Sequence, residues 1–109
     1  MNINELLNNY QKAFNSKDLE RLEQMFSEDI ILKDWDISAK GKNSVLKANK
    51  NIFDSVETIN CKTIKNYVLG STAICVLKIL INNKEEIEVI DIIEFDHEEK
   101  ICSIRAYKG

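Results

Sequence analysis

The sequence predicts an α+β fold in which helices cover one face of a curved antiparallel sheet. Two observations predict this class. Apolar residues recur at helical spacing in the first half of the chain, whereas the second half holds four stretches rich in β-branched and aromatic residues, separated by short turns. The 109 residues contain no proline and no internal repeat. We therefore expect a single domain over residues 1–109.

Three helices are expected. The first covers residues 3–15, where apolar side chains lie three and four positions apart: Ile3, Leu6, Leu7, Tyr10, Ala13 and Phe14. Asp18 is placed to cap a second helix, whose core side is Leu19, Leu22, Met25 and Phe26. Asn43 or Ser44 can cap a third helix that runs to about residue 55.

Five strands are expected around these helices. Residues 30–36 form the first strand, before the third helix. The other four form an antiparallel meander after that helix, over residues 58–69, 72–81, 85–95 and 101–107. Strand 72–81 is apolar on both faces. One face can pack under the helices, so the other needs a second cover, and we expect a homodimer through the outer sheet face.

Three polar residues lie on apolar faces. In strand 85–95, Asp91 alternates with Ile87, Val89, Ile93 and Phe95, so it points inward and is either neutral or paired. It can be a structural acid bonded to the backbone, or an active-site acid with raised proton affinity. Asp34 shares a face with Ile30 and Leu32, and Tyr10 belongs to the apolar stripe of the first helix. A buried tyrosine must find a partner for its hydroxyl.

Composition excludes several function classes. The net charge of −3 offers no basic surface for nucleic acid or for an anionic membrane. The longest apolar run, residues 73–77, is too short to span a membrane, and residues 1–5 lack a secretion signal, so a cytoplasmic location is expected. Three unpaired cysteines (Cys61, Cys75 and Cys102) are expected to be reduced core thiols. His97 lies in an acidic turn, and no metal site or cofactor is expected.

The chain resembles a known superfamily. The residues that carry this resemblance are the segment from Tyr10 to Leu19, Met25 to Asp29, Gly41, and the segment from Asp91 to Tyr107. They are similar to the nuclear-transport-factor-two-like (NTF2-like) superfamily, with SnoaL-like and ketosteroid isomerase-like proteins as the nearest relatives. The resemblance implies a cone-shaped curved antiparallel sheet, also described as a cystatin-like α+β barrel, with three helices on its concave face around a pocket.

The resemblance to ketosteroid isomerase also implies roles for the three polar residues. Tyr10 and a protonated Asp91 match the groups that donate hydrogen bonds to the enolate in that enzyme, and Asp34 matches the aspartate that moves the proton. This mechanism belongs to the enzyme and is carried over by resemblance alone. It is chemically coherent, since a neutral acid and a phenol can donate to an oxyanion while a carboxylate accepts a proton from carbon.

The expected pocket is more polar than that of the isomerase. Asn49 replaces a supporting tyrosine, and Lys108 replaces an aromatic residue that packs on the steroid. We therefore expect a smaller or more polar carbonyl compound as ligand, and no steroid. Trp35 can line the pocket or plug it. The expected lining residues are Phe14, Trp35, Asn49, Phe53, Val89, Ile104, Ala106 and Lys108.

Three functions remain open at this point. The first is an isomerase or cyclase that abstracts a proton next to a carbonyl, with Tyr10, Asp34 and Asp91 as catalytic residues. The second is a non-catalytic domain that binds a small molecule. The third is an assembly module that uses the outer sheet face. An open cavity with convergent polar groups favours the first, and a filled cone favours the third.

Overall fold

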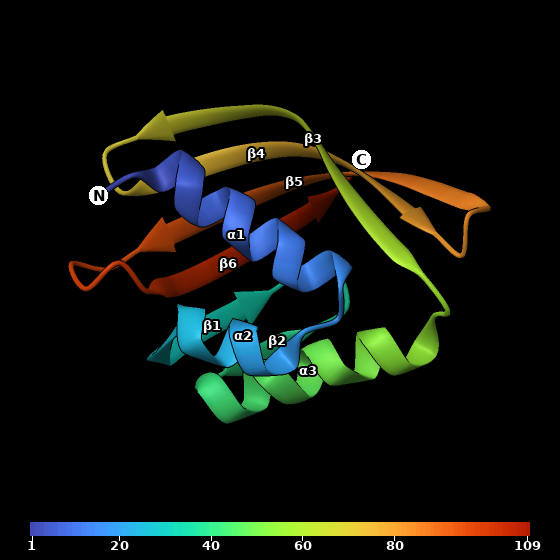
Figure 1. Cartoon of the computed structure of the whole chain (residues 1–109), viewed down its shortest axis with the longest axis horizontal. Coiled ribbons are helices and arrows are strands. Elements are labelled where there is room, and N and C mark those ends of the chain that lie inside the picture. Colours follow the sequence, from blue (N-terminus) through green and yellow to red (C-terminus); the bar gives the residue numbers. More distant parts are fainter.

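The computed structural model describes all 109 residues, which form three helices and one six-stranded sheet (Figure 1). The helices are α1 (Ile3–Asn15), α2 (Leu19–Met25) and α3 (Lys42–Ser55). The strands are β1 (Phe26–Lys33), β2 (Ser38–Lys40), β3 (Ile59–Leu69), β4 (Thr72–Ile81), β5 (Glu85–Phe95) and β6 (Ile101–Lys108). The predicted α+β class is confirmed.

The sheet is mixed and open, with the strand order β2-β1-β6-β5-β4-β3. Strands β3 to β6 form the expected antiparallel meander, but β1 pairs with β6 in parallel, so the sheet is not antiparallel throughout. The direction of this pairing depends on how α3 returns the chain to the far edge of the sheet. A strand pattern does not encode that return, which explains the difference from the expectation.

Three local boundaries differ from the expected ones. Phe26 is the first residue of β1 rather than part of the second helix, and β1 ends at Lys33, so Asp34 follows the strand directly. The short strand β2, which pairs with β1, was not expected. Helix α3 begins two or three residues earlier than expected, with Gly41 as its N-cap and no side-chain cap. Gly41 has a φ of 88°, which glycine adopts without steric cost.

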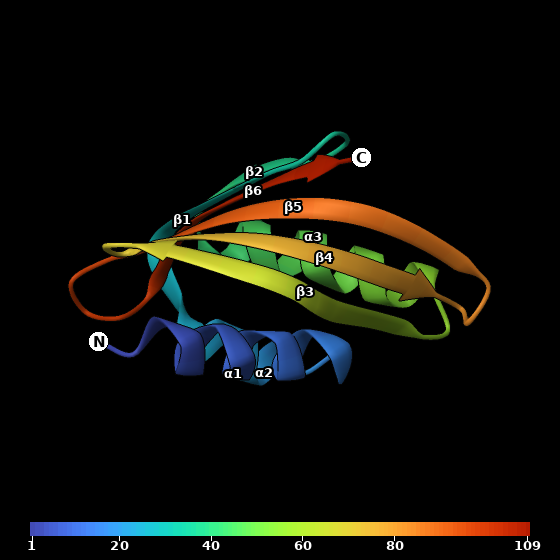
Figure 2. The same ribbon diagram turned by 90° about the horizontal axis from the view of Figure 1, so that it is seen from above.

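The sheet curves around the helical layer, as the view from above shows (Figure 2). Helix α1 lies along the concave side of the meander and contacts β3, whereas α3 packs on β1 and β2. The largest fully buried side chains lie between these layers: Leu22, Phe26, Ile30, Val45, Ile93 and Ile101. The helices therefore cover the concave face, as expected for a cone-shaped sheet.

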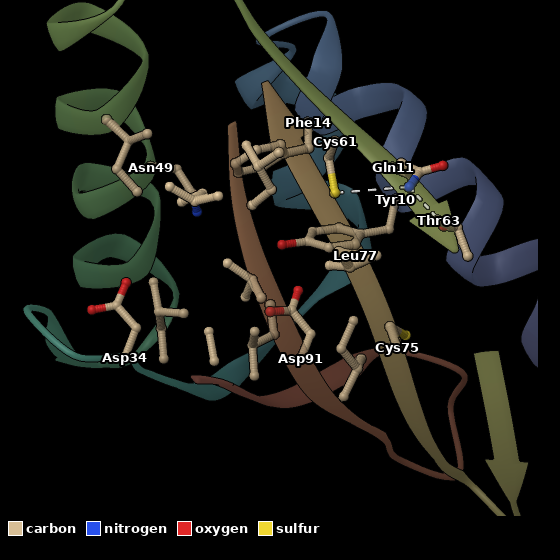
Figure 3. Close-up of a pocket in the computed structure, with 18 of the residues that line it drawn as sticks. Tyr10, Gln11, Phe14, Asp34, Asn49, Cys61, Thr63, Cys75, Leu77 and Asp91 are labelled. Carbon is tan, nitrogen blue, oxygen red and sulfur yellow. Dashed lines mark hydrogen bonds between the residues drawn. The ribbon is translucent and has the colours of Figure 1, made fainter. Parts of the chain in front are cut away.

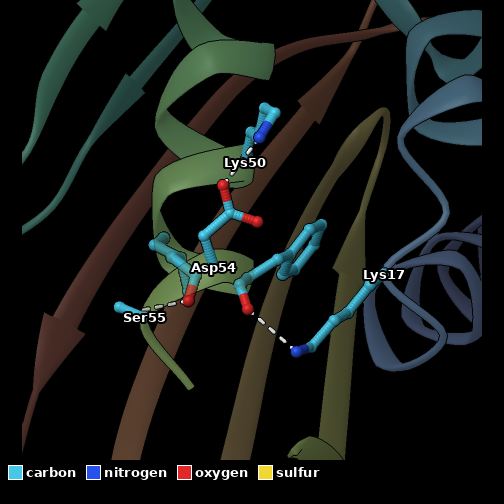
Figure 4. Close-up of polar contacts among 6 residues, drawn as sticks. Lys17, Lys50, Asp54 and Ser55 are labelled. Atoms are coloured by element: carbon cyan, nitrogen blue, oxygen red, sulfur yellow. Dashed lines mark hydrogen bonds and ion pairs between the residues drawn. The ribbon is translucent and has the colours of Figure 1, made fainter. Parts of the chain in front are cut away.

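Hydrogen bonds connect the C-terminal end of α1 to β3 and to the end of α3. Asn15 bonds to the backbone of Cys61 on β3 twice, accepting from its N–H at 2.7 Å and donating to its carbonyl at 3.0 Å. The ammonium of Lys17 donates to the carbonyl of Phe53, in the last turn of α3, and to those of Val56 and Glu57, which follow this helix. Figure 4 shows Lys17 reaching the end of α3. A cation at this position satisfies helix carbonyls that lack a partner. These contacts hold the C-terminal end of α1 against β3 and against the end of α3.

Candidate functional site

A cavity of about 240 Å³ lies between the helices and the concave face of the sheet (Figure 3). Of its 23 lining residues, 16 are hydrophobic. They come from α1, α3, β1, the connection between β1 and β2, and the inward-facing positions of the meander. The volume lies just below the usual range of ligand pockets, about 300–1,000 Å³, so the cavity suits a small ligand.

Asp91 lies in this cavity, on the inward face of β5. Its neighbours along that face, Val89 and Ile93, are buried. The carboxyl makes no hydrogen bond or ion pair with another residue, so its environment offers little to stabilise the ionised form. Burial, with a smaller contribution from the negative charge of Asp34, raises the pKa of Asp91 from 3.8 to about 7. The carboxyl is therefore mostly protonated below neutral pH and about half protonated at pH 7.

Tyr10 projects from α1 into the same space. Its ring packs at 6.2 Å from that of Phe14 and at 6.3 Å from that of Phe26. Figure 3 shows the Tyr10 hydroxyl and the Asp91 carboxyl directed into one cavity. Burial, followed by the charge of Asp91, raises the pKa of Tyr10 well above its usual value of 10. The hydroxyl has no hydrogen-bond partner in the protein, so this phenol is a free donor for a ligand.

Asp34 lines the cavity from the turn that follows β1, on the other side from Cys75 (Figure 3). Its Oδ1 accepts hydrogen bonds from the backbone N–H groups of Asp36, at 2.8 Å, and Ile37, at 2.6 Å. Its own N–H donates to the Ile37 carbonyl at 2.9 Å. This turn fixes the direction of the carboxylate and leaves Oδ2 without a partner. The structure thus brings Tyr10, Asp34 and Asp91 to one cavity.

The family follows from comparison with known proteins. A sequence model that describes a SnoaL-like domain matches residues 3–90. The chain belongs to the SnoaL-like domain family. A comparison with proteins of curated function found no match.

Solved structures share the architecture of this SnoaL-like domain at low sequence identity. A provisionally assigned SnoaL-like polyketide cyclase from Shewanella denitrificans matches with a TM-score of 0.88 and 13% identity, over 98% of this chain and 90% of that chain. A provisionally assigned ketosteroid isomerase from Kribbella flavida gives 0.82 and 12%, over 98% and 77%. A protein of unknown function with a cystatin-like fold, from Methylobium petroleophilum, gives 0.85 and 12%, over 98% and 75%. These similarities show the fold alone.

The remaining expected lining residues of the SnoaL-like domain divide into two groups. Phe14, Trp35, Asn49, Val89, Ile104 and Ala106 line the cavity, whereas Phe53 and Lys108 lie outside it. Phe53 is buried behind Phe14, with ring centroids 5.2 Å apart. Lys108 is exposed, and its ammonium lies 5.9 Å from the centre of the Trp35 ring. Because Trp35 is 51% exposed, it stands at the edge of the cavity and does not plug it.

Several polar lining residues were missed at the sequence level. Gln11 and Thr63 are joined by a hydrogen bond of 2.7 Å, and Asn66 lies further along β3. All three cysteines are free, as expected, but Cys61 and Cys75 also line the cavity. Burial raises the pKa of Cys61 to about 11 and that of Cys75 to about 12. The inward parity of β4, which Cys75 shares with Ala73 and Leu77, was the available signal for Cys75.

The structure contains no cluster of three or more His, Cys, Asp or Glu side chains able to hold a metal ion. None of its helices is both long and apolar enough to cross a membrane.

Proposed function

We propose that this SnoaL-like domain binds a small carbonyl compound and catalyses an isomerisation or cyclisation by abstracting a proton next to the carbonyl. The unpaired Asp91 carboxyl in the apolar cavity carries this proposal. A carboxyl with a pKa of about 7 can donate a hydrogen bond at neutral pH, and the free Tyr10 hydroxyl beside it is a second donor. Two donors that face a mainly apolar space are suited to a developing oxyanion.

In this mechanism, a carboxylate oxygen of Asp34 takes a proton from the carbon next to the carbonyl. The C–H electron pair forms a carbon–carbon double bond, and the carbonyl electrons move onto oxygen. Tyr10 and Asp91 donate hydrogen bonds to that oxygen. Asp34 then returns the proton to another carbon, which completes an isomerisation. Alternatively, the enolate carbon attacks a second carbonyl of the same molecule, which closes a ring. The first carbonyl reforms, the electrons of the second carbonyl move onto its oxygen, and the proton held by Asp34 neutralises this new alkoxide.

The cavity limits the ligand to a small molecule. Its walls are mainly aliphatic and aromatic, and its volume is about 240 Å³. Asn49 adds a buried amide, whose Nδ2 donates to the Val45 carbonyl at 3.0 Å. The other end of this amide is a hydrogen-bond acceptor for the ligand. These features support a one- or two-ring ketone with a polar substituent.

Turnover of small β,γ-unsaturated ketones tests this function, because their conversion into conjugated enones can be followed by ultraviolet absorbance. We expect Asp34→Asn to abolish most turnover and Tyr10→Phe to lower kcat by about 10²-fold, the effect of losing one oxyanion donor. Lys47→Ala, at an exposed site on α3, is the control. Equal rates for the wild type and Asp34→Asn across the panel contradict the proposed mechanism.

A non-catalytic binding domain is the second candidate, and the turn around Asp34 favours it. The Oδ1 of Asp34 is already bonded to two backbone N–H groups, which is also what a purely structural aspartate does. This candidate predicts that small ketones bind in the cavity without turnover. Calorimetry with the same panel therefore separates the two candidates.

We also propose that the convex face of the sheet forms a homodimer. Strands β3 to β6 expose large apolar side chains on this face, including Tyr67 (55%), Ile74 (41%), Ile90 (42%) and Tyr107 (53%). Their register supports one continuous patch, since Ile90 pairs with Tyr107 and Ile74 pairs with Tyr67 across neighbouring strands. A contiguous apolar patch of this kind is typical of a protein interface.

A further inference from the structure

A second hollow adjoins the apolar cavity, between α1 and β3. Its volume is about 500 Å³, and only one of its eight lining residues is hydrophobic. The lining residues are Asn2, Asn4, Glu5, Leu7, Asn8, Gln11, Thr63 and Asn66. We call this hollow the polar groove. Its lining is rich in amide side chains, which can both donate and accept hydrogen bonds.

The polar groove and the apolar cavity share one wall. Leu7, Gln11, Thr63 and Asn66 line both spaces. Within this wall, Gln11 Nε2 donates to Thr63 Oγ1 at 2.7 Å and lies 3.8 Å from Cys61 Sγ (Figure 3). The wall is therefore closed here by a contact between two side chains. Rotation of the Gln11 side chain would break only these side-chain contacts and no backbone hydrogen bond of the sheet or of the helix.

Asn66, in this wall, has a buried side-chain oxygen for which the protein supplies no hydrogen-bond partner. Its Oδ1 is fully buried and has no hydrogen-bond partner, the one such side-chain atom in the protein. A buried polar atom without a partner is costly, and native proteins satisfy most of them with protein groups, water or a ligand. The pairing of β3 with β4 is irregular between Thr63 and Lys65. This irregularity changes the alternation of the strand, so Thr63 and Asn66 both face inward.

Asn66 is also in register with Asp91, one of the three catalytic candidates. It pairs with Cys75 on β4, which in turn pairs with Asp91 on β5. Two strand spacings, about 10 Å, therefore separate Asn66 from Asp91 along one row of the concave face. A ligand whose carbonyl reaches Asp91 can thus place a second polar group at Asn66 and extend from there into the polar groove.

We infer that Gln11, Thr63 and Asn66 form a second subsite, which receives a neutral, hydroxyl- or amide-bearing extension of the carbonyl ligand. The inference rests on the proposed function for the position of the carbonyl. The groove contains no basic residue and one acidic residue, Glu5, so its charge disfavours a phosphate or carboxylate extension. The ligand is then two-part: an apolar carbonyl body in the cavity and an uncharged polar extension in the groove.

Calorimetry with three related probes tests this subsite: 4-hydroxyacetophenone, its β-glucoside, and 4-acetylphenyl phosphate. In the wild type, we expect the glucoside to bind about tenfold more tightly than the parent ketone, the gain expected from about two net hydrogen bonds. The phosphate ester should show no gain. Asn66→Val and Gln11→Leu should each weaken binding of the glucoside much more than binding of the parent ketone, and so remove most of the glucoside's advantage. Asn51→Ala, at an exposed position on α3, is the control.

The outcomes separate this inference from the proposed function. If the parent ketone binds but the glucoside has no advantage, or keeps its advantage in both variants, the subsite is wrong and the proposed function stands. A gain of equal size for the phosphate ester overturns the uncharged ligand class. If no probe binds the folded wild type, both the subsite and the proposed carbonyl pocket are overturned. Thermal melts of each variant establish that it is folded.

Discussion

The pKa of Asp91 makes the stability of the protein depend on pH in a way that Asp91→Asn should remove. The carboxyl has a pKa of about 7 in the folded protein and an ordinary value of 3.8. Well below pH 3.8 it is protonated in both the folded and the unfolded state and does not change the free energy of unfolding. As the pH rises from 4 to 7, the unfolded state loses the proton first, so the free energy of unfolding falls. Above pH 7 the loss is complete.

The two pKa values set the size of this effect. Each pKa difference of one corresponds to about 1.36 kcal/mol, so the difference between about 7 and 3.8 gives an upper limit of about 4 kcal/mol at pH 8. Asp91 retains some contact with the open cavity, and we expect a measured effect of about 2–4 kcal/mol. Asparagine has nearly the same shape and no charge. Asp91→Asn should therefore match the wild type near pH 4 and exceed its stability by this amount at pH 8.

Urea denaturation at several pH values between 4 and 8 measures this difference directly. Glu86→Gln is a matched control, because Glu86 lies on the same strand but on the exposed face. Its effect on the free energy of unfolding should stay within about 0.5 kcal/mol at every pH. The reasoning is refuted if Asp91→Asn is less stable than the wild type at pH 8. That result would mean that Asp91 is ionised and paired in the folded protein.

Three further predictions concern other parts of the structure. Lys17→Met removes three hydrogen bonds at the C-terminal end of α3 and should lower the free energy of unfolding by about 2–3 kcal/mol, measured by urea denaturation. Lys12→Met, at an exposed site, is the control and should change it by less than about 0.5 kcal/mol. Equal effects of the two substitutions would contradict the capping role of Lys17. Size measurement at micromolar concentration should give a dimer, and Ile90→Lys should give a folded monomer; a monomeric wild type rules out the convex interface. For a ketone that the protein turns over, kcat/KM should fall above about pH 7 as Asp91 ionises. Asp91→Asn should lack this decline. If the dependence of kcat/KM on pH is the same in Asp91→Asn, Asp91 is not the titrating donor.

The sequence by itself predicted the class of the fold and the orientation of its main polar residues. Helical spacing in residues 3–15 and alternation in residues 85–95 depend only on local geometry, and they put Tyr10 and Asp91 on apolar faces. The N-cap role of Asp18 was likewise local, and the structure confirms it, since its side chain accepts from the Arg21 N–H. Reading one strand or one helix at a time is sufficient for such features, because period and capping are set within about four residues.

The tertiary structure decided how these faces meet. The parallel pairing of β1 with β6 depends on the path of α3, and the inward position of Asn66 depends on an irregular register between β3 and β4. The Gln11–Thr63 bond joins residues 52 positions apart in the chain. Phe53 follows the apolar pattern of its helix, but packing places it behind Phe14 and not in the cavity. Periodicity fixes which side of an element faces inward, whereas the space left between elements depends on the volumes of side chains that come from distant segments. That space determines which residues a ligand can reach.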